Sequence, residues 1–325
     1  MSAAASVRIV VLGYLNVDHV LGLNRELEPG VTALVERRHT PSGGRLGGCA
    51  SYIATGLAAS GAAVAVVSSV GRDAEAAVVE SSLAAAGVET SGVEQREAQR
   101  TGVTYLPYAP THASYCIYDP GGPLPERLTE AQRELCRRAG WLVAAVGAPA
   151  PCAEALAVAP AQASVFWAVK GDPASFPAPL ARALAERAAV IVYSAAERPF
   201  LEQQLGADWR RDLARPDALV VETHGHEGAR YWDGGREGRI RPEAAIAAWD
   251  TIGAGDRFCA GLLAARIGGA DAEAAVRAGA ETAAALLRER ADASPARGLA
   301  HDDEGDDEGR MNTYAGTRVV PGRNA

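Results

Sequence analysis

The chain has 325 residues, of which 48% are hydrophobic, and this is enough to fill the core of one large α/β domain or of two small ones. Its formal net charge of −8 argues against a nucleic-acid partner, which would require a basic patch. No apolar run approaches the roughly 20 residues of a membrane span, and residues 1–6 lack the basic start of a signal peptide. The five cysteines are dispersed without a C-x-x-C pair, which favours reduced thiols in the cytoplasm over disulfides or a zinc site.

The first ligand-binding candidates follow the first predicted strand. Residues 7–13 are an apolar run that ends in glycine, which is typical of a buried parallel strand. Asn16 and Asp18 come directly after it, where open α/β sheets bind their ligands, although a turn-forming aspartate is the alternative there. Residues 19–42 contain glycines, prolines and short β-like runs such as 31–35, so we expect strands that leave the main sheet.

The middle of the chain alternates between helical and strand-like segments. A glycine-rich stretch at 43–48 opens a small-residue helix at about 49–60, which Gly61 ends. The further elements that we expect are a strand at 63–70, a helix at 74–86, strands at 101–106 and 114–118, a helix at about 129–138, a strand at 141–146, a helix at about 152–158, a strand at 164–169, a helix at about 178–187, and strands at 189–193 and 218–222. This alternation is typical of a mostly parallel sheet covered by helices.

A glycine-rich turn opens a buried helix near the end of the pattern. Gly253, Ala254 and Gly255 come directly before Asp256, and apolar residues recur at 258, 259, 262 and 263, on one face of a helix. Such a turn lets backbone N–H groups and the helix N-terminus bind an anion. Asp256 is a proton acceptor, and a hydroxyl that attacks a phosphoryl group needs both an anion site and a base.

Three other interpretations of this turn compete with a catalytic base at Asp256. Aspartate is a favoured N-cap, so Asp256 alone is as well explained by a helix cap. A dinucleotide site would need the pattern G-x-G-x-x-G, but Phe258 occupies the third glycine position. A Walker loop would need Gly-Lys-Ser or Gly-Lys-Thr, and neither occurs in the chain. The cap therefore remains the alternative to the catalytic base. A second helix is expected after this one, at 271–287.

The run D-T-I-G-A-G-D-R-F at residues 250–258 closely resembles the C-terminal signature of the ribokinase-like carbohydrate kinases of the phosphofructokinase-B type. Residues 47–73 and 221–229 resemble two further motifs of that family, so the resemblance covers about residues 7–290. It implies a ribokinase-like three-layer sandwich with a mostly parallel central sheet and a small β lid. It also implies a kinase that uses ATP, bound with Mg²⁺, to phosphorylate a hydroxyl of a small sugar or nucleoside.

The resemblance assigns roles to individual residues. It implies that Asp256 is the catalytic base, beside an anion hole made by Gly253, Ala254 and Gly255. The acceptor would be held by residues after the first strand and at a glycine hinge, namely Asn16, Asp18, Gly47, Gly48 and Tyr52. The nucleotide would be held by Ser194, Thr223, Gly225 and Gly228. Glu197 would act on the magnesium shell through water, which suits a cation that keeps several waters.

Three positions depart from the family pattern. Arg257 stands where a small residue is usual, Tyr52 where an asparagine commonly contacts the sugar, and Ser194 in place of the asparagine of Asn-x-x-Glu. They favour, as the alternative, a non-catalytic sugar- or nucleotide-binding member of the same fold. The motifs do not select a substrate. A sugar phosphate would require basic residues in the pocket, for which Arg45 and Lys170 are candidates.

The domain organisation also follows from the resemblance. We expect a kinase domain at 1–298, whose lid is formed from about 15–42 and 99–118. Because the family's lids often pair between subunits, a homodimer through the lid is expected. Residues 299–325 include a block of acidic residues without aromatics, so a disordered, solvated tail is predicted there.

Overall fold

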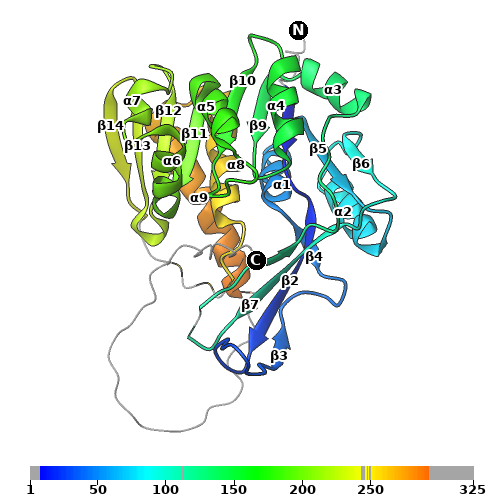
Figure 1. Cartoon of the computed structure of the whole chain (residues 1–325). Helices are drawn as coiled ribbons and strands as arrows, with labels where there is room; N and C mark the ends of the chain where they lie inside the picture. The colour runs from blue at the N-terminus through cyan, green and yellow to red at the C-terminus, as the bar shows by residue number, and fades with distance from the viewer. Residues whose placement is uncertain (1–7, 112, 243–245, 247, 249, 293–325) are drawn as a thin grey trace, which may run out of the picture.

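The computed structural model describes residues 8–292 except 112, 243–245, 247 and 249. The predicted acidic tail at 299–325 lies outside these residues. Strands and helices alternate to form a large sheet with helices on both faces, and a smaller sheet projects from one end of this body (Figure 1). The predicted α/β fold with a large, mostly parallel central sheet is confirmed.

The large sheet places the first strand of the chain well inside it. The order across the sheet is β14 (Arg236–Ile240), β13 (Ala229–Asp233), β12 (Leu219–Thr223), β11 (Ala188–Ser194), β10 (Ser164–Ala168), β9 (Trp141–Ala144), β1 (Ile9–Leu12), β5 (Val64–Val70) and β6 (Val93–Gln95). The pairs β12–β13 and β13–β14 are antiparallel, and the other neighbouring pairs are parallel. The carboxyl ends of the parallel strands therefore meet at one edge, which is where such sheets bind ligands.

Two hydrophobic cores lie on the two faces of this sheet. Successive residues of β1 alternate between them, since Ile9 and Val11 pack in one core and Val10 and Leu12 in the other. One core is covered by α1 (Cys49–Ala59), α2 (Ala74–Ala85), α8 (Ala254–Ile267) and α9 (Ala272–Asp292). The other is covered by α3 (Glu130–Arg137), α4 (Pro149–Val158), α5 (Ala178–Arg187), α6 (Arg198–Leu205) and α7 (Trp209–Asp212). None of the helices in the described part of the chain is long and apolar enough to cross a membrane.

The small sheet is built from two segments, one between β1 and α1 and the other between β6 and α3. Its strands are β3 (Val35–Arg38), β2 (Asn16–Leu23), β7 (Gly102–Tyr108) and β8 (Ile117–Asp119) in spatial order, with β4 (Arg45–Gly47) paired to β2 as well. The β-like run that we expected at 31–35 is a strand only at its last residue, because residues 31–34 belong to no strand and β3 begins at Val35. All four residues of β3 are exposed, so the sequence there lacks the alternation of apolar and polar residues that predicts a half-buried strand.

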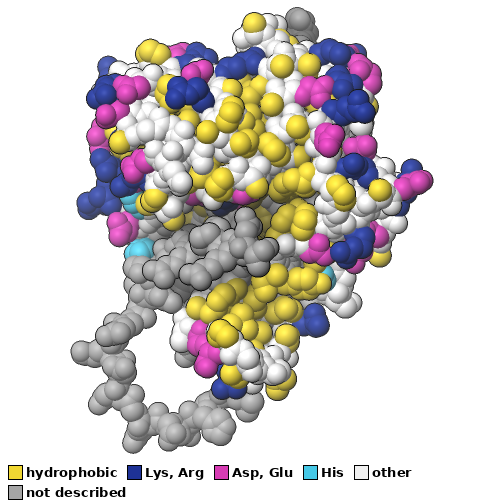
Figure 2. Space-filling view, viewed as in Figure 1, with side chains coloured by type: hydrophobic (Ala, Val, Ile, Leu, Met, Phe, Trp, Pro, Cys, Tyr) yellow, Lys and Arg dark blue, Asp and Glu magenta, His cyan; other side chains and the backbone are white. Residues whose placement is uncertain are grey.

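Hydrophobic side chains lie on the surface of the small sheet. Figure 2 shows them gathered over this sheet, whereas charged side chains are spread over the large body. On its strands Ile117 (54%), Tyr105 (44%) and Val35 (44%) are exposed, and Leu34 (61%) directly precedes β3. An apolar surface of this kind on a sheet with free edges is the usual mark of a binding face.

Candidate active site

The glycine turn lies at the N-terminus of α8, which packs between α1 and α9. Gly253 is the N-cap of this helix and has a φ of +80°, in the left-handed region that favours glycine. Asp256 is the third residue inside the helix. Gly253 rather than Asp256 therefore caps α8, and the interpretation of Asp256 as the N-cap is wrong.

The backbone of the turn presents N–H groups at its open end. The Gly253 carbonyl accepts the first helical hydrogen bond, from the Arg257 N–H at 2.8 Å. The Ala254 N–H donates to the Thr251 carbonyl at 3.2 Å, which closes the turn. The Gly255 and Asp256 N–H groups belong to the first turn of the helix, where the helix itself supplies no acceptor. An anion at this terminus would meet these groups and the positive end of the helix dipole.

Asp256 sits in a nearly dry environment. Its exposed fraction is 8%, and the Cys49 thiol donates a hydrogen bond to its carboxylate. Burial raises the pKa of Asp256, and the opposing effects of the Lys170 ammonium, the Cys49 thiol and the Arg257 guanidinium do not cancel it. A carboxylate with a raised pKa is a stronger proton acceptor than a solvated one, which suits a general base.

Asp18 and Asn16 lie together on β2, at the joint between the two sheets. The Asn16 amide donates to Asp18 Oδ1 at 2.7 Å and to Thr104 Oγ1 at 2.7 Å. The Tyr52 hydroxyl donates to the other carboxylate oxygen of Asp18 at 2.9 Å. The exposed fraction of Asp18 is 2%, and burial raises its pKa to about 6 against these two hydrogen bonds and the charge of Arg45.

The two glycines of the hinge are required by the close approach of this cluster. Gly47 ends β4, and a Cβ at this position would clash with the Asp18 carboxylate. Gly48 is the N-cap of α1 with a φ of +92°, and a Cβ there would clash with the Tyr14 carbonyl. Both glycines therefore let the start of α1 approach β2 within contact distance of Asn16 and Asp18.

Tyr52 connects the Asp18 cluster to the glycine turn. Its hydroxyl bonds to Asp18, while its ring lies against Gly253, where an added Cβ would be 2.7 to 2.9 Å from three ring carbons. Arg257 points elsewhere, toward α1, because its Nη1 atom would be 2.9 Å from a Cβ on Gly56. Of these two departures from the family motif, Tyr52 lies inside the site and Arg257 packs behind it.

Sequence reasoning did not foresee the ion-pair cluster around Asp250. Arg45 Nη1 lies 2.7 Å from Asp250 Oδ2, and Arg290 Nη1 lies 3.2 Å from Asp250 Oδ1. Arg290 also donates to the carbonyl oxygens of Asp250 and Ile252, so α9 holds the segment that leads into the glycine turn. Asp250 is the first residue of the sequence motif. Its position directly before the glycine turn was the only sequence feature that could have indicated a role for it.

The residues predicted for the nucleotide lie at the ends of two neighbouring strands. Ser194 ends β11 and Thr223 ends β12, and the two are directly paired in the parallel ladder. The Ser194 N–H donates to Glu197 Oε2 at 2.7 Å. Gly225 and Gly228 follow with φ values of +55° and +97°, and a Cβ on Gly228 would clash with the Ile240 carbonyl. The loop after β12 therefore passes close to β14.

Glu222 was not expected to matter for this loop, but it holds the loop in place. It is 2% exposed, accepts a hydrogen bond from the Tyr193 hydroxyl at 2.8 Å, and pairs with Arg198. His224 Nε2 lies 2.8 Å from Glu222 Oε1. Hydrogen bonds from Arg198 and Tyr193 keep the pKa of Glu222 below its usual value although burial acts in the opposite sense.

Lys170 and Glu197 stand between the Asp256 and nucleotide sides of this edge. Lys170 follows β10, and its Nζ atom lies 3.6 Å from Glu197 Oε1. The Lys170 ammonium also acts on the carboxylate of Asp256, as its effect on the pKa of that group shows. The structure thus brings the catalytic, metal and nucleotide candidates to one edge of the large sheet, with the acceptor candidates at its joint to the small sheet.

A family model described as pfkB family carbohydrate kinase matches residues 8–297. The chain belongs to this family. No curated protein sequence matches it. Similar solved structures include a Methanocaldococcus jannaschii nucleoside kinase of the ribokinase family, with 18% identity, coverage of 86% of this chain and 91% of that chain, and a TM-score of 0.72. Arabidopsis thaliana ribokinase in complex with ribose and ATP has 20% identity, coverage of 87% and 93%, and a TM-score of 0.70. These likenesses show the fold.

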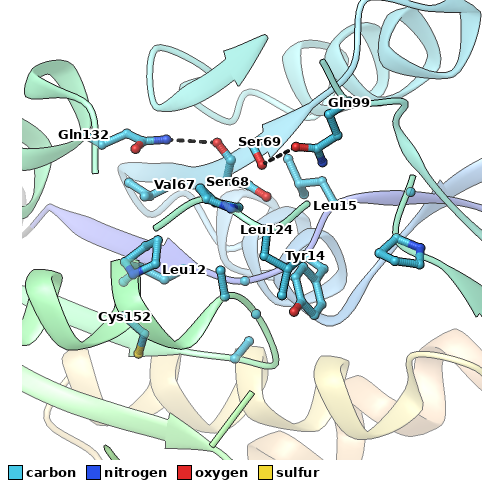
Figure 3. A pocket seen from close by; sticks show the side chains of 18 of the residues that line it. Leu12, Tyr14, Leu15, Val67, Ser68, Ser69, Gln99, Leu124, Gln132 and Cys152 are labelled. Carbon is cyan, nitrogen blue, oxygen red and sulfur yellow. Dashed lines mark hydrogen bonds between the residues drawn. The ribbon is translucent and has the colours of Figure 1, made fainter. Parts of the chain in front are cut away.

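A pocket of this pfkB-family protein is lined by none of the residues predicted for the site, although Gly13, Tyr14 and Leu15, which directly precede Asn16, line it. It has about 580 Å³ of empty space, part of it open to solvent, and Leu12, Ser69 and Cys152 are among its lining residues (Figure 3). The Gln132 amide at its wall donates to the Ser68 and Gly92 carbonyls, both at 2.9 Å, and the Ser69 hydroxyl donates to Gln99 at 3.4 Å. The Gln132 and Ser69 side chains are thus engaged in internal hydrogen bonds.

Proposed function

We propose that this pfkB-family chain is an ATP-dependent kinase that phosphorylates a hydroxyl group of a small sugar or nucleoside. The observation that carries the proposal is the buried carboxylate of Asp256, one helical turn from a glycine N-cap and next to N–H groups that an anion would meet. The hydroxyl proton would pass to Asp256 as the oxygen attacks the γ-phosphorus. The N–H groups at the Gly253-Ala254-Gly255 turn would stabilise the developing charge.

The nucleotide would lie along the ends of β11 and β12. Thr223, Gly225 and Gly228 lie in the loop at the carboxyl end of β12, and Ser194 is paired to Thr223 beside it. This arrangement would direct the terminal phosphate toward the N-terminus of α8. The same edge of a sheet binds nucleotides in open α/β folds, which supports this placement.

Magnesium would reach the site with the nucleotide phosphates. The described residues hold no group of three or more His, Cys, Asp or Glu side chains arranged to bind a metal. Mg²⁺ needs no such cage, since it keeps several waters and is bound mainly by phosphates and one or two carboxylates. Glu197 fits an outer role, because one of its oxygens accepts the Ser194 N–H while the other faces Lys170. The cation would neutralise phosphate charge.

The acceptor would bind at the joint of the two sheets. Asp18 and Asn16 supply a carboxylate and an amide, and Gly47 and Gly48 let the start of α1 pack directly against them. Tyr52 lies between this cluster and the glycine turn. A hydroxyl-bearing ring that is held here would be adjacent to Asp256, which supports a sugar or nucleoside as the acceptor.

The test is a screen for ADP release with Mg²⁺ and ATP over pentoses, hexoses, sugar phosphates and nucleosides. We expect acceptor-dependent ADP release with at least one compound of these classes, and a matching phosphorylated product by mass spectrometry. Release of ADP at the same rate without any acceptor, or none with the full panel, would contradict the proposal.

A non-catalytic ligand-binding protein of the same family is the second candidate. It is favoured by Asp18, because both of its oxygens already accept internal hydrogen bonds and the residue is 2% exposed. A sugar could use this carboxylate only after displacing Tyr52 or Asn16. Calorimetry distinguishes the two candidates, since binding of a sugar and ATP without turnover would identify the second.

We also propose that the small sheet pairs two copies of the chain and that the protein works in the cytoplasm. Val35 and Ile117 on the small sheet are exposed by 44% and 54%, which supports a second copy as the cover. The five cysteines are unpaired, as in a reducing compartment. Light scattering in solution gives the mass of the assembly, and a monomer at micromolar concentration would contradict the pairing.

A further inference from the structure

Lys170 is the only lysine in the 325 residues. The chain carries 32 basic residues other than histidine, and the remaining 31 are arginine. Among the described residues, the ion pairs that do not involve Lys170 use arginine or histidine as the cation. Composition therefore does not explain a lysine at this position, and its place in the structure must.

Lys170 lies where the parts of the proposed site converge. It follows β10, which lies between β9 and β11 in the parallel part of the sheet, so its backbone is at the ligand-binding edge. Its Nζ atom is 3.6 Å from Glu197 Oε1, and its side chain is 48% exposed, so an incoming ligand can reach it. Its charge acts on Asp256 and Cys259 of α8 and on Cys49 of α1.

The arginines near the site are held by carboxylates or directed toward another helix. Arg45 and Arg290 both pair with Asp250, and Arg198 pairs with the buried Glu222. Arg257 points toward Gly56 of α1. The transferring phosphoryl group would meet two carboxylates here, those of Asp256 and Glu197, and it needs a full positive charge to offset them.

A lysine suits this task better than an arginine. The ammonium is a compact point charge on a flexible stem, whereas the guanidinium is planar and holds its partners in a fixed fork. A point charge can follow a phosphoryl group as it passes from ADP to the acceptor. This explains why a chain that uses arginine elsewhere has lysine at this one position.

We propose that Lys170 binds the γ-phosphoryl group of ATP during transfer. When the nucleotide arrives, the Lys170 ammonium moves from Glu197 to the phosphate. The inference rests on the proposed kinase function. The acceptor oxygen forms a bond to the γ-phosphorus as the bond from that phosphorus to the bridging oxygen breaks, and the electron pair of the broken bond stays on ADP. The hydroxyl proton goes to Asp256, and Lys170 keeps its protons throughout.

The first test compares ADP with a non-hydrolysable ATP analogue by calorimetry, with Mg²⁺ and without acceptor. Lys170→Met should lower the affinity for the analogue by about 10- to 100-fold, which is the usual contribution of a charge-assisted hydrogen bond. It should change the affinity for ADP by less than about threefold. Lys170→Arg should restore part of the analogue affinity. Arg182→Met is the matched control for loss of one positive charge, because Arg182 lies on α5 and pairs with Glu186 of the same helix, with both side chains about half exposed.

The second test uses the single lysine directly. Reductive methylation of the wild-type chain can label only the N-terminal amine and Lys170, so mass spectrometry reads one internal site. The analogue should protect Lys170 from methylation, whereas ADP should not. Equal protection by both nucleotides would overturn the inference.

The outcomes separate this inference from the proposed function. If the wild type binds neither nucleotide, the kinase proposal fails and the inference falls with it. If the wild type binds the analogue and Lys170→Met binds it equally well, only the inference fails. If Lys170→Met raises only the KM for the acceptor, Lys170 recognises the acceptor and the inference is likewise overturned.

Discussion

The two glycines of the anion turn make a matched pair for mutation, because the structure gives them opposite surroundings. Gly253 has a φ of +80°, and an alanine in the left-handed region costs about 1–2 kcal/mol. Its Cβ would lie 2.7 to 2.9 Å from the ring of Tyr52, which is 8% exposed. Moving a packed ring costs about 1–3 kcal/mol. Gly253→Ala should therefore destabilise the fold by about 2–5 kcal/mol.

Gly255 lies two residues later and has no strain of this kind. It is inside α8, and an added Cβ would meet no atom within 4 Å. Alanine is favoured over glycine in a helix by about 0.5–1 kcal/mol, so Gly255→Ala should leave the protein equally stable or slightly more stable. The same open space is where the phosphoryl group is proposed to lie, so the methyl group should lower kcat.

Urea denaturation and steady-state kinetics on both variants test this reasoning. We expect Gly253→Ala to lose both stability and turnover, and Gly255→Ala to lose turnover alone. Equal stability of the two variants would refute the account of the turn. Full activity in Gly255→Ala would show that the open space beside the helix N-terminus is not used by the phosphoryl group.

Two further predictions concern the acceptor side. Tyr52→Phe removes the 2.9 Å hydrogen bond to Asp18, so it should lower the free energy of unfolding by about 1–3 kcal/mol. It should also lower the KM for the acceptor, because the sugar no longer has to displace the phenol. A raised KM would show that Tyr52 binds the acceptor instead. The pKa of Asp18 is raised from 3.8 to about 6, so its contribution to stability is full below about pH 4 and is lost as the pH rises through 6. Between pH 4 and 7 the free energy of unfolding should fall by up to about 3 kcal/mol less in Asp18→Asn than in the wild type, measured by denaturation. Parallel plots of this free energy against pH for the two proteins would contradict the prediction.

The sequence was most informative where a local pattern alone decides the structure. The buried parallel strands β1, β5 and β10 are short apolar runs, and apolar runs bounded by glycine or turns specify such strands without reference to partners. Gly253 and Gly228 could likewise be placed in turns, because their positive φ values and close contacts leave no room for another residue. The order of the family motifs along the chain then indicated that their residues form one site.

Contacts between distant segments could not be predicted in this way. The Cys49 thiol meets Asp256, and Arg45 meets Asp250, across about two hundred residues of chain, and no spacing in the sequence encodes either approach. The hairpin of β13 and β14 was missed although Gly234 and Gly235 lie between the strands with positive φ values, a known turn signal. Strand β3 was misplaced because its side chains are all exposed.

Asp256 is the centre of the proposed function, and one substitution tests it most directly. Asp256→Asn keeps the size of the side chain and its place in α8 but removes the proton acceptor. With an acceptor found by the ADP-release screen, kcat should fall by about 10²–10⁴, the usual worth of a general base. Nucleotide affinity, measured by calorimetry on the same preparation, should change little because the N–H groups of the turn remain. Turnover close to that of the wild type would contradict the account.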